Sequence, residues 1–214
     1  LRSASVRFKA LAPAILIIVG LLATATSCLA ARINLVGFGD SLMAGYELSP
    51  EEAFPARLEK LLRDKGYDVS IANAGVSGDT SADGLARLDW SIPDGTQGVI
   101  LEMGANDALR GLSPDDTRKN LEAMIERLKQ RNIAILLVGI VAPPNMGTDY
   151  EQQFNRIYGE LAAKHKLPLY PFFLDGVAMN PKLQLKDGMH PNGQGTTIMA
   201  EKLLPMAEAF VKLF

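Results

Sequence analysis

The chain has 214 residues, which is enough for one α/β domain with a substantial core and too few for two comfortable ones. Apolar residues make up 48% and charged residues 21% of the sequence, as in an ordinary globular protein. The formal net charge is -2 and no basic run suits a phosphate backbone, which argues against nucleic acid as a partner.

The first thirty residues have the three-part plan of a secretory signal peptide. Basic residues precede an apolar core from about residue 10 to 25, and small residues follow it. We expect residues 1–30 to be a signal peptide cleaved after Ala30, residues 31–214 to be the folded domain, and the location to be periplasmic or secreted. The alternatives are an uncleaved anchor, for which the core is shorter than the ~20 residues of a spanning helix, and a lipoprotein signal at Cys28. Removal of the leader would leave no cysteine, so no disulfide would be needed.

The apolar run at residues 33–38 predicts the first strand. A charged residue opens it and glycine closes it, which is typical of a buried strand in a parallel sheet. The segment Gly39-Asp40-Ser41-Leu42 follows directly. A serine on the turn after such a strand lies at the carboxyl end of the sheet, where open α/β folds bind ligands. Ser41 is therefore the candidate nucleophile.

Helical and strand patterns then alternate to the end of the chain. Serine followed by proline and acidic residues predicts helix starts at Ser49 and Ser113, and Thr80 can cap a helix between them. Pro205 lies inside the last helical pattern and should kink or split that helix. The expected further strands are 67–73, 97–103, 133–140 and 167–173, with helices also around 154–161 and from about 193.

Five strands alternating with helices predict a three-layer α/β/α fold with a flavodoxin-like parallel sheet. The expected strand order is 2-1-3-4-5, whose switch point lies between the first and third strands. Ser41 ends the first strand and Asn106 follows the third. Both candidates should therefore flank the same crevice.

A serine hydroxyl needs a base, usually a histidine that a carboxylate orients. The sequence has two histidines. His165 stands between two lysines at a helix end and is interpreted as a solvated surface residue. His190 follows Asp187 by three residues just before the last helix, so Asp187 could orient one ring nitrogen while the other faces Ser41. A turn-stabilising role for the same segment remains open, because Asp-Gly and His-Pro form turns.

Acyl transfer also needs donors for an oxyanion. The candidates are the backbone N–H groups of Ser41 and Gly78 and the side-chain amide of Asn106. Turn and cap roles are the alternatives for Gly78 and Asn106. Four such motifs after successive strand positions on one sheet edge favour a catalytic site.

These four blocks resemble the SGNH, or GDSL, hydrolases. The resemblance runs from about Ile33 to the C-terminus and is closest to the bacterial periplasmic thioesterase, arylesterase and lysophospholipase branch. It implies that Ser41 is the nucleophile, His190 the base and Asp187 its partner, with Ser41, Gly78 and Asn106 as the oxyanion hole. It also implies a serine esterase without metal or cofactor that cleaves short- to medium-chain acyl or aryl esters through an acyl-enzyme.

Thioesters and lysophospholipids are further substrate candidates, and the expected partner is a small acyl-ester or lipid-like molecule. We expect no membrane span in the mature chain, and the sequence leaves the oligomeric state open. Residues that could line the acyl site, each equally open to ordinary packing, are Met43, Leu109, Arg110, Leu112, Pro143, Pro144 and Met189.

Three other functions compete with this interpretation. Asp40, Asp79 and Asp107 recur beside the site and could serve metal-dependent phosphoryl transfer, but no metal-ligand spacing accompanies them, which favours cap and loop roles. A carbohydrate acetylesterase could use the same fold. A non-catalytic binding domain would be expected to show a broken Ser-His-Asp set, whereas the set here is complete.

Overall fold

The computed structural model describes residues 32–214. The predicted signal peptide and its cleavage site lie outside these residues. The centre of the fold is a five-stranded sheet in which every pairing is parallel and the order is β2-β1-β3-β4-β5, which confirms the predicted topology. The strands are β1 (Ile33–Gly39), β2 (Val69–Gly75), β3 (Gly98–Glu102), β4 (Ala134–Val138) and β5 (Leu169–Tyr170).

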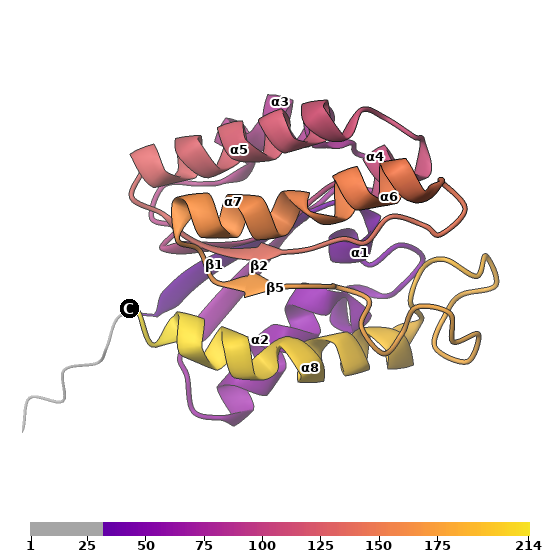
Figure 1. Cartoon of the computed structure of the whole chain (residues 1–214). Coiled ribbons are helices and arrows are strands. Elements are labelled where there is room, and N and C mark those ends of the chain that lie inside the picture. Colours follow the sequence, from indigo (N-terminus) through magenta and orange to yellow (C-terminus); the bar gives the residue numbers. More distant parts are fainter. Residues whose placement is uncertain (1–31) are drawn as a thin grey trace, which may run out of the picture. The chain divides into compact units, whose positions relative to one another are not determined.

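Helices cover both faces of the sheet, so the fold has the predicted three layers (Figure 1). One layer holds α2 (Phe54–Asp64) and α8 (Gly193–Val211). The other holds α3 (Ser81–Ser91), α5 (Pro114–Gln130), α6 (Thr148–Asn155) and α7 (Ile157–His165). Two short helices, α1 (Ser41–Ala44) and α4 (Ala105–Leu109), and the 3-10 turn η1 (Pro50–Glu52) follow strands or precede longer helices.

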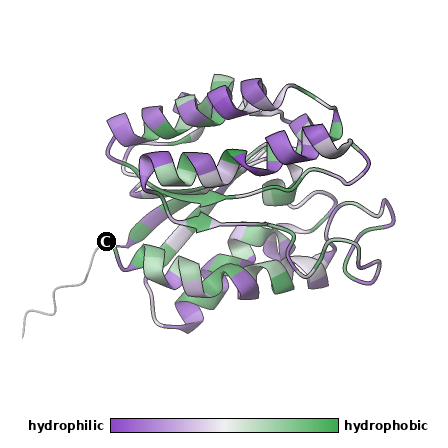
Figure 2. Cartoon of the chain, in the orientation of Figure 1, coloured by the Kyte–Doolittle hydropathy of each residue, from purple (hydrophilic) through white to green (hydrophobic). Residues whose placement is uncertain are grey.

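The core lies on both sides of the sheet because its central strands are mostly apolar and buried. All five residues of β3 are buried, as are four of the five in β4. The amphipathic α5 turns Leu121, Met124, Ile125 and Leu128 inward at helical spacing. Hydrophobic colour accordingly concentrates in the strands and on the inner helix faces (Figure 2).

Capping explains where two of the helices begin. The Thr80 side chain accepts the N–H of Asp83 and forms a capping box at α3, and the Ser113 side chain accepts the N–H of Asp116 at α5. The start predicted at Ser49 is wrong in part. Ser49 does form a capping box, but it opens only the turn η1, because Ala53 is extended and α2 begins at Phe54.

Three other expectations differ from the structure. The fifth strand pairs over two residues instead of seven, because Pro168 and Pro171 flank it and proline has no N–H for a ladder. The helical pattern around 154–161 belongs to two helices, α6 and α7, which meet at Arg156. Helix α8 runs unsplit through Pro205, which lies on its exposed side, where water can bond the carbonyl that proline leaves free.

Within residues 32–214, no helix combines the length and apolarity that crossing a bilayer requires.

Candidate active site

Ser41 lies at the first position of α1, immediately after β1. The side chain of Asp40 caps this helix, because its Oδ1 accepts the N–H of Leu42 at 3.0 Å. Asp40 is fully buried, whereas Ser41 retains 8% exposure. The turn from strand to helix therefore holds the serine hydroxyl at the carboxyl edge of the sheet.

His190 and Asp187 reach the same edge from the loop before α8. The ring Nε2 of His190 lies 2.9 Å from the Oγ of Ser41, and its Nδ1 lies 2.6 Å from the Oδ2 of Asp187. The other oxygen of Asp187 accepts the N–H groups of Met189 and His190 at 2.9 and 3.0 Å. The structure thus brings the three predicted side chains into one hydrogen-bonded chain.

The loop that carries this pair closes on itself as a narrow hairpin. The N–H of Leu185 bonds the carbonyl of His190 at 2.7 Å, and Gln184 forms an antiparallel bridge with Pro191. Gly188 adopts a positive φ of 67°, a conformation that glycine accepts without steric cost. The Asp-Gly turn is therefore what places the carboxylate of Asp187 against the ring of His190.

The carboxylate of Asp187 is well suited to remain charged. Desolvation raises its pKa, but the hydrogen bonds from the His190 ring and from two backbone N–H groups outweigh that effect. The net result is a pKa below the ordinary value of an aspartate. An ionised carboxylate on Nδ1 fixes the ring tautomer and stabilises the imidazolium that forms when Nε2 takes a proton.

Tyr46 covers the histidine from one side. Its ring centroid lies 4.5 Å from that of His190 with an interplanar angle of 36°. Tyr46 was not predictable from the sequence pattern, because it lies in a loop without periodicity. The only signal for it was its closeness to Ser41 along the chain.

The candidate oxyanion donors lie beside Ser41. Gly78 has a φ of 89°, which favours glycine, and its carbonyl accepts the guanidinium of Arg110 at 2.7 Å. Asn106 lies in α4, where one of its amide N–H groups bonds the carbonyl of Asp79 at 2.9 Å. An amide carries two N–H groups, and a side-chain hydrogen bond from Asn106 also lowers the pKa of the buried Asp40, against the larger effect of burial. Ser41, Gly78 and Asn106 all line the same cavity.

This cavity has a volume of about 760 Å³, within the usual range of small-molecule sites. Its walls are largely apolar. Four predicted wall residues line it, namely Leu109, Pro143, Pro144 and Met189. Further residues that line it are Leu42, Tyr46, Ser77, Ala105, Ala108, Ile140, Val141, Ala142, Phe172, Leu174, Ala178, Met179, Gln184 and Gly188.

Three other predicted wall residues do not line the cavity. Met43 is fully buried, and its side chain fills the space beside Gly37 and Gly39 of β1. Arg110 instead bonds the carbonyl of Gly78. The backbone of Leu112 accepts the hydroxyl of Tyr150 at 2.9 Å. Strand and helix patterns could not separate these residues from the wall, because the wall depends on loop paths.

The three aspartates near the site have separate protein partners. Asp79 pairs with Arg87 at 2.6 Å, and Asp107 accepts the N–H of Ser81 at 2.7 Å and the hydroxyls of Ser81 and Thr117. Asp40 caps α1. These contacts agree with cap and loop roles, which the sequence analysis favoured over a metal cluster.

The interpretation of His165 as a solvated residue is wrong. Its side chain is only 9% exposed, and Nε2 lies 2.9 Å from Glu122. Among the described residues, Glu122, Glu126 and His165 are the only group whose ligand atoms lie close enough to hold a cation, and Lys164 already pairs with Glu122. This pairing leaves no reason to assign a metal there.

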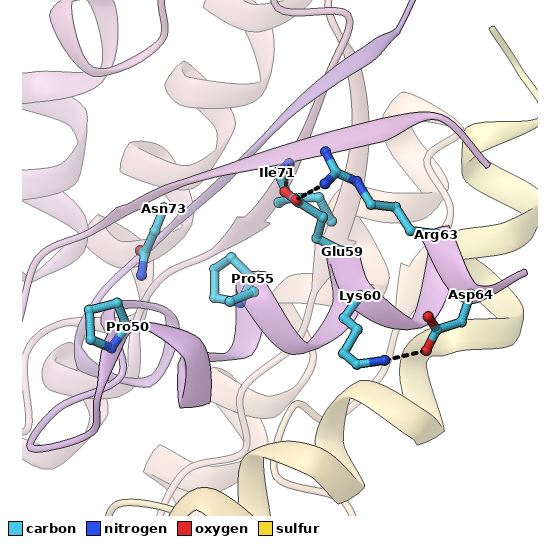
Figure 3. A pocket seen from close by; sticks show the side chains of 9 residues that line it. Pro50, Pro55, Glu59, Lys60, Arg63, Asp64, Ile71 and Asn73 are labelled. Atoms are coloured by element: carbon cyan, nitrogen blue, oxygen red, sulfur yellow. Dashed lines mark hydrogen bonds and ion pairs between the residues drawn. The ribbon is translucent and has the colours of Figure 1, made fainter. Parts of the chain in front are cut away.

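A second hollow, of about 420 Å³, lies against α2 and the edge strand β2 (Figure 3). Its charged groups bond to one another: Lys60 to Asp64 at 2.6 Å, and Arg63 to Glu59 at 3.1 Å. The hollow therefore offers no unengaged charged group for a ligand, and the chemistry concentrates at the other cavity.

Serine, histidine and aspartate in series, beside amide donors at the carboxyl edge of a five-stranded parallel sheet, define a serine hydrolase of the SGNH type. The model of the GDSL-like Lipase/Acylhydrolase family matches residues 38–198, and the chain belongs to this family. The chain is accordingly an enzyme of the serine esterase class.

Curated relatives agree with this class. The chain is 42% identical to Esterase TesA of Pseudomonas aeruginosa over 163 residues, which covers 76% of this chain and 81% of the relative. It is 38% identical to an arylesterase of Vibrio mimicus, with 78% and 84% covered. Identity is also 38% to Thioesterase 1/protease 1/lysophospholipase L1 of Escherichia coli K12, with 85% and 86% covered.

Solved structures share the fold. The crystal structure of TesA superposes with a TM-score of 0.76 at 39% identity, covering 80% of this chain and 96% of that one. The SGNH-hydrolase family esterase AlinE4 gives a TM-score of 0.71 at 45% identity, covering 86% and 97%.

Proposed function

We propose that the protein hydrolyses short- to medium-chain acyl or aryl esters through an acyl-enzyme formed on Ser41. The observation that carries this proposal is the 2.9 Å contact between the Oγ of Ser41 and the Nε2 of His190, with Asp187 on the opposite ring nitrogen. A hydroxyl within hydrogen-bond reach of an oriented imidazole is the arrangement in which serine becomes a nucleophile at neutral pH.

In the first half of the reaction, Nε2 of His190 takes the proton of Ser41 as Oγ bonds to the ester carbonyl carbon. The carbonyl oxygen becomes an oxyanion. The imidazolium, stabilised by Asp187, then gives its proton to the leaving oxygen as the carbon–oxygen bond breaks. Water repeats the sequence on the acyl-enzyme: His190 takes a proton from it, the acid leaves, and Ser41 regains its proton.

Three donors would stabilise the oxyanion in both halves. They are the backbone N–H groups of Ser41 and Gly78 and the side-chain amide of Asn106. Support comes from their position, because all three residues line one cavity and Asn106 is already held by the carbonyl of Asp79. Donors that are fixed before the reaction need no reorganisation when charge develops.

The cavity walls support an apolar acyl or aryl group as the substrate. Leu109, Val141, Pro143 and Met189 offer apolar contact and few donors, which suits an alkyl chain or a phenyl ring better than a sugar. A carbohydrate acetylesterase is therefore disfavoured. The names of the relatives add thioesters and lysophospholipids as substrates to test.

The test is Ser41→Ala in a panel of p-nitrophenyl esters, an acyl thioester and an acetylated sugar. We expect loss of ester hydrolysis and of covalent labelling by an organophosphate probe, because the nucleophile is gone. Ser70→Ala, on the edge strand β2 away from the cavity, is the matched control and should keep both. Full activity of Ser41→Ala would refute the proposal.

We also propose export to the periplasm or the medium. Support comes from the composition of residues 1–30, with basic residues, an apolar core and small residues in order. The N-terminal sequence of the protein recovered from the periplasm or medium should begin at Ala31. Recovery of the intact leader in the cytoplasm would contradict this.

A further inference from the structure

Arg87 of α3 is a buried arginine that uses every nitrogen of its guanidinium. Nε bonds the carboxylate of Asp79 at 2.6 Å, one terminal nitrogen bonds the carbonyl of Ala74 at 2.9 Å, and the other bonds the carbonyl of Gly39 at 2.8 Å. Its central carbon lies 4.1 Å above the ring centroid of Phe38. Burying a guanidinium is costly unless it is paired and hydrogen-bonded, and here all of these conditions are met.

Three of its four acceptors belong to the segments that carry the oxyanion donors. The fourth is the hydroxyl of Ser91 on α3 itself, 3.3 Å from the nitrogen that also bonds Ala74. Gly39 lies two residues before Ser41, and Ala74 and Asp79 bracket the loop that holds Gly78. Asn106, the third donor, is connected to Arg87 through Asp79, because the backbone carbonyl of Asp79 accepts the side-chain amide of Asn106 at 2.9 Å. One rigid planar group therefore connects the ends of β1 and β2 and, through Asp79, the start of α4.

Arg87 itself cannot touch a substrate. It is 6% exposed and does not line the cavity. Any effect on the reaction must pass through the segments that it holds. A lysine could not replace it, since an ammonium is a point charge without the fixed fork that reaches three acceptors in separate directions.

We propose that Arg87 is a positioning residue that sets the spacing between the three oxyanion donors. This inference rests on the proposed function, in which Ser41, Gly78 and Asn106 stabilise the oxyanion. A displaced donor weakens contacts that form in the transition state and leaves ground-state binding nearly intact. The loss should therefore fall on kcat, with little change in KM.

The experiment is a double-mutant cycle with Arg87→Lys and Asn106→Ala on a p-nitrophenyl ester. An organophosphate titration counts the active sites, so that kcat refers to folded enzyme only. Deleting one oxyanion donor costs roughly 10²–10³ in kcat, so Arg87→Lys, which only displaces donors, should cost about 10- to 100-fold. KM should change less than about twofold.

The two substitutions should not be additive, since both act on the same donors. In the Asn106→Ala background, Arg87→Lys should cost only about threefold or less. A purely structural role for Arg87 would lower the number of titrated sites or the unfolding midpoint and leave kcat per site unchanged. That result, or full additivity, would overturn the proposal.

Two further variants keep the test decisive. Arg131→Lys is the matched control, because Arg131 also donates to a backbone carbonyl, that of Ile92 at 2.7 Å, and does not line the cavity. It should keep the wild-type kcat. If Arg87→Lys does not fold, Asp79→Asn removes the charge that Arg87 pairs with at a partly exposed position, and it should lower kcat in the same way. An unchanged kcat in that variant would also overturn the proposal.

Failure of this inference is distinguishable from failure of the proposed function. If Ser41→Ala abolishes hydrolysis while Arg87→Lys keeps its kcat, only the positioning role is lost. If Ser41→Ala remains active, the oxyanion site itself is wrong.

Discussion

Tyr46 is partly exposed and contacts the imidazole of His190. Its ring packs on that imidazole at 4.5 Å, and the residue also lines the cavity. Aromatic pairs of this kind contribute about 0.5–1.5 kcal/mol beyond their buried area. The ring contact restrains the histidine in the orientation that reaches both Ser41 and Asp187.

We therefore expect Tyr46→Ala to lower kcat by about three- to tenfold, the equivalent of that energy, because the imidazole gains freedom. Tyr46→Phe keeps the ring and should stay within about twofold of wild type. Steady-state kinetics on one ester with titrated active sites will check this. Equal losses in the two variants would show that the hydroxyl matters and the ring contact does not.

The contact among Ser41, His190 and Asp187 was predictable from residue order. Each segment follows a strand position, parallel strands end at one edge, and only two histidines were available. Tyr46 and Met179 were not predictable in the same way. Met179 is 87% exposed with a φ of 63°, and its place on the cavity depends on a loop that has neither period nor cap.

The ends of β1 and β3 bring two carboxyl groups together inside the core. Glu102, the last residue of β3, is fully buried, and its Oε2 accepts the N–H of Asp40 at 3.3 Å. Burial raises the pKa of Asp40 to about 6. Burial and the nearby Asp40 carboxylate raise the pKa of Glu102 well above its ordinary value.

This pair should make stability depend on pH in a defined direction. In the folded state the two carboxyls keep protons that the unfolded chain releases near pH 3.8 and pH 4.5. Their contribution to the free energy of unfolding is therefore complete below those pH values. It is lost as pH rises through the folded pKa of each group, for Asp40 between about 4 and about 6. Each proton changes the free energy of unfolding by at most about 1.4 kcal/mol per pH unit.

Glu102→Gln removes one of the two carboxyls and keeps its shape. The free energy of unfolding of wild type minus that of the variant should therefore fall as pH rises from 4 through 6 and beyond. Urea unfolding of both proteins across that range measures this difference. A flat difference for Glu102→Gln would contradict the assignment.

At the scale of elements, strand order was more predictable than strand length. Alternating helices force crossovers and so a parallel sheet, whereas the extent of β5 depends on whether Pro168 and Pro171 leave N–H groups to pair. The buried carboxyl of Glu102 was missed for a related reason. It ends an apolar run, where periodicity marks a strand but does not show that Asp40, just after the neighbouring strand β1, supplies a second acid.

The whole domain has its core and its site within the described residues. Buried side chains run from Leu35 to Val211, and no cysteine lies in that span, because the one cysteine of the chain is Cys28. Packing alone therefore holds the fold, without a cross-link. A chain that starts at Ala31 should then fold and carry the full site.

We expect such a chain to have the same kcat per titrated site as the longer form, and an unfolding midpoint that does not change with added thiol reductant. Thermal unfolding with and without reductant, paired with ester turnover, will check both. A midpoint that falls in reductant, or a loss of turnover on removing residues 1–30, would contradict this.

The hydrogen bond between Ser41 and His190 joins positions that are 149 residues apart in the chain. A ribosome synthesises Ser41, the proposed nucleophile, early and His190, the proposed base, near the end, and α8 follows the loop that holds His190. Under the proposed mechanism, a partial product of translation that stops short of His190 lacks the base and cannot cleave an ester. Catalytic activity should therefore begin only after nearly the whole domain has been synthesised and folded.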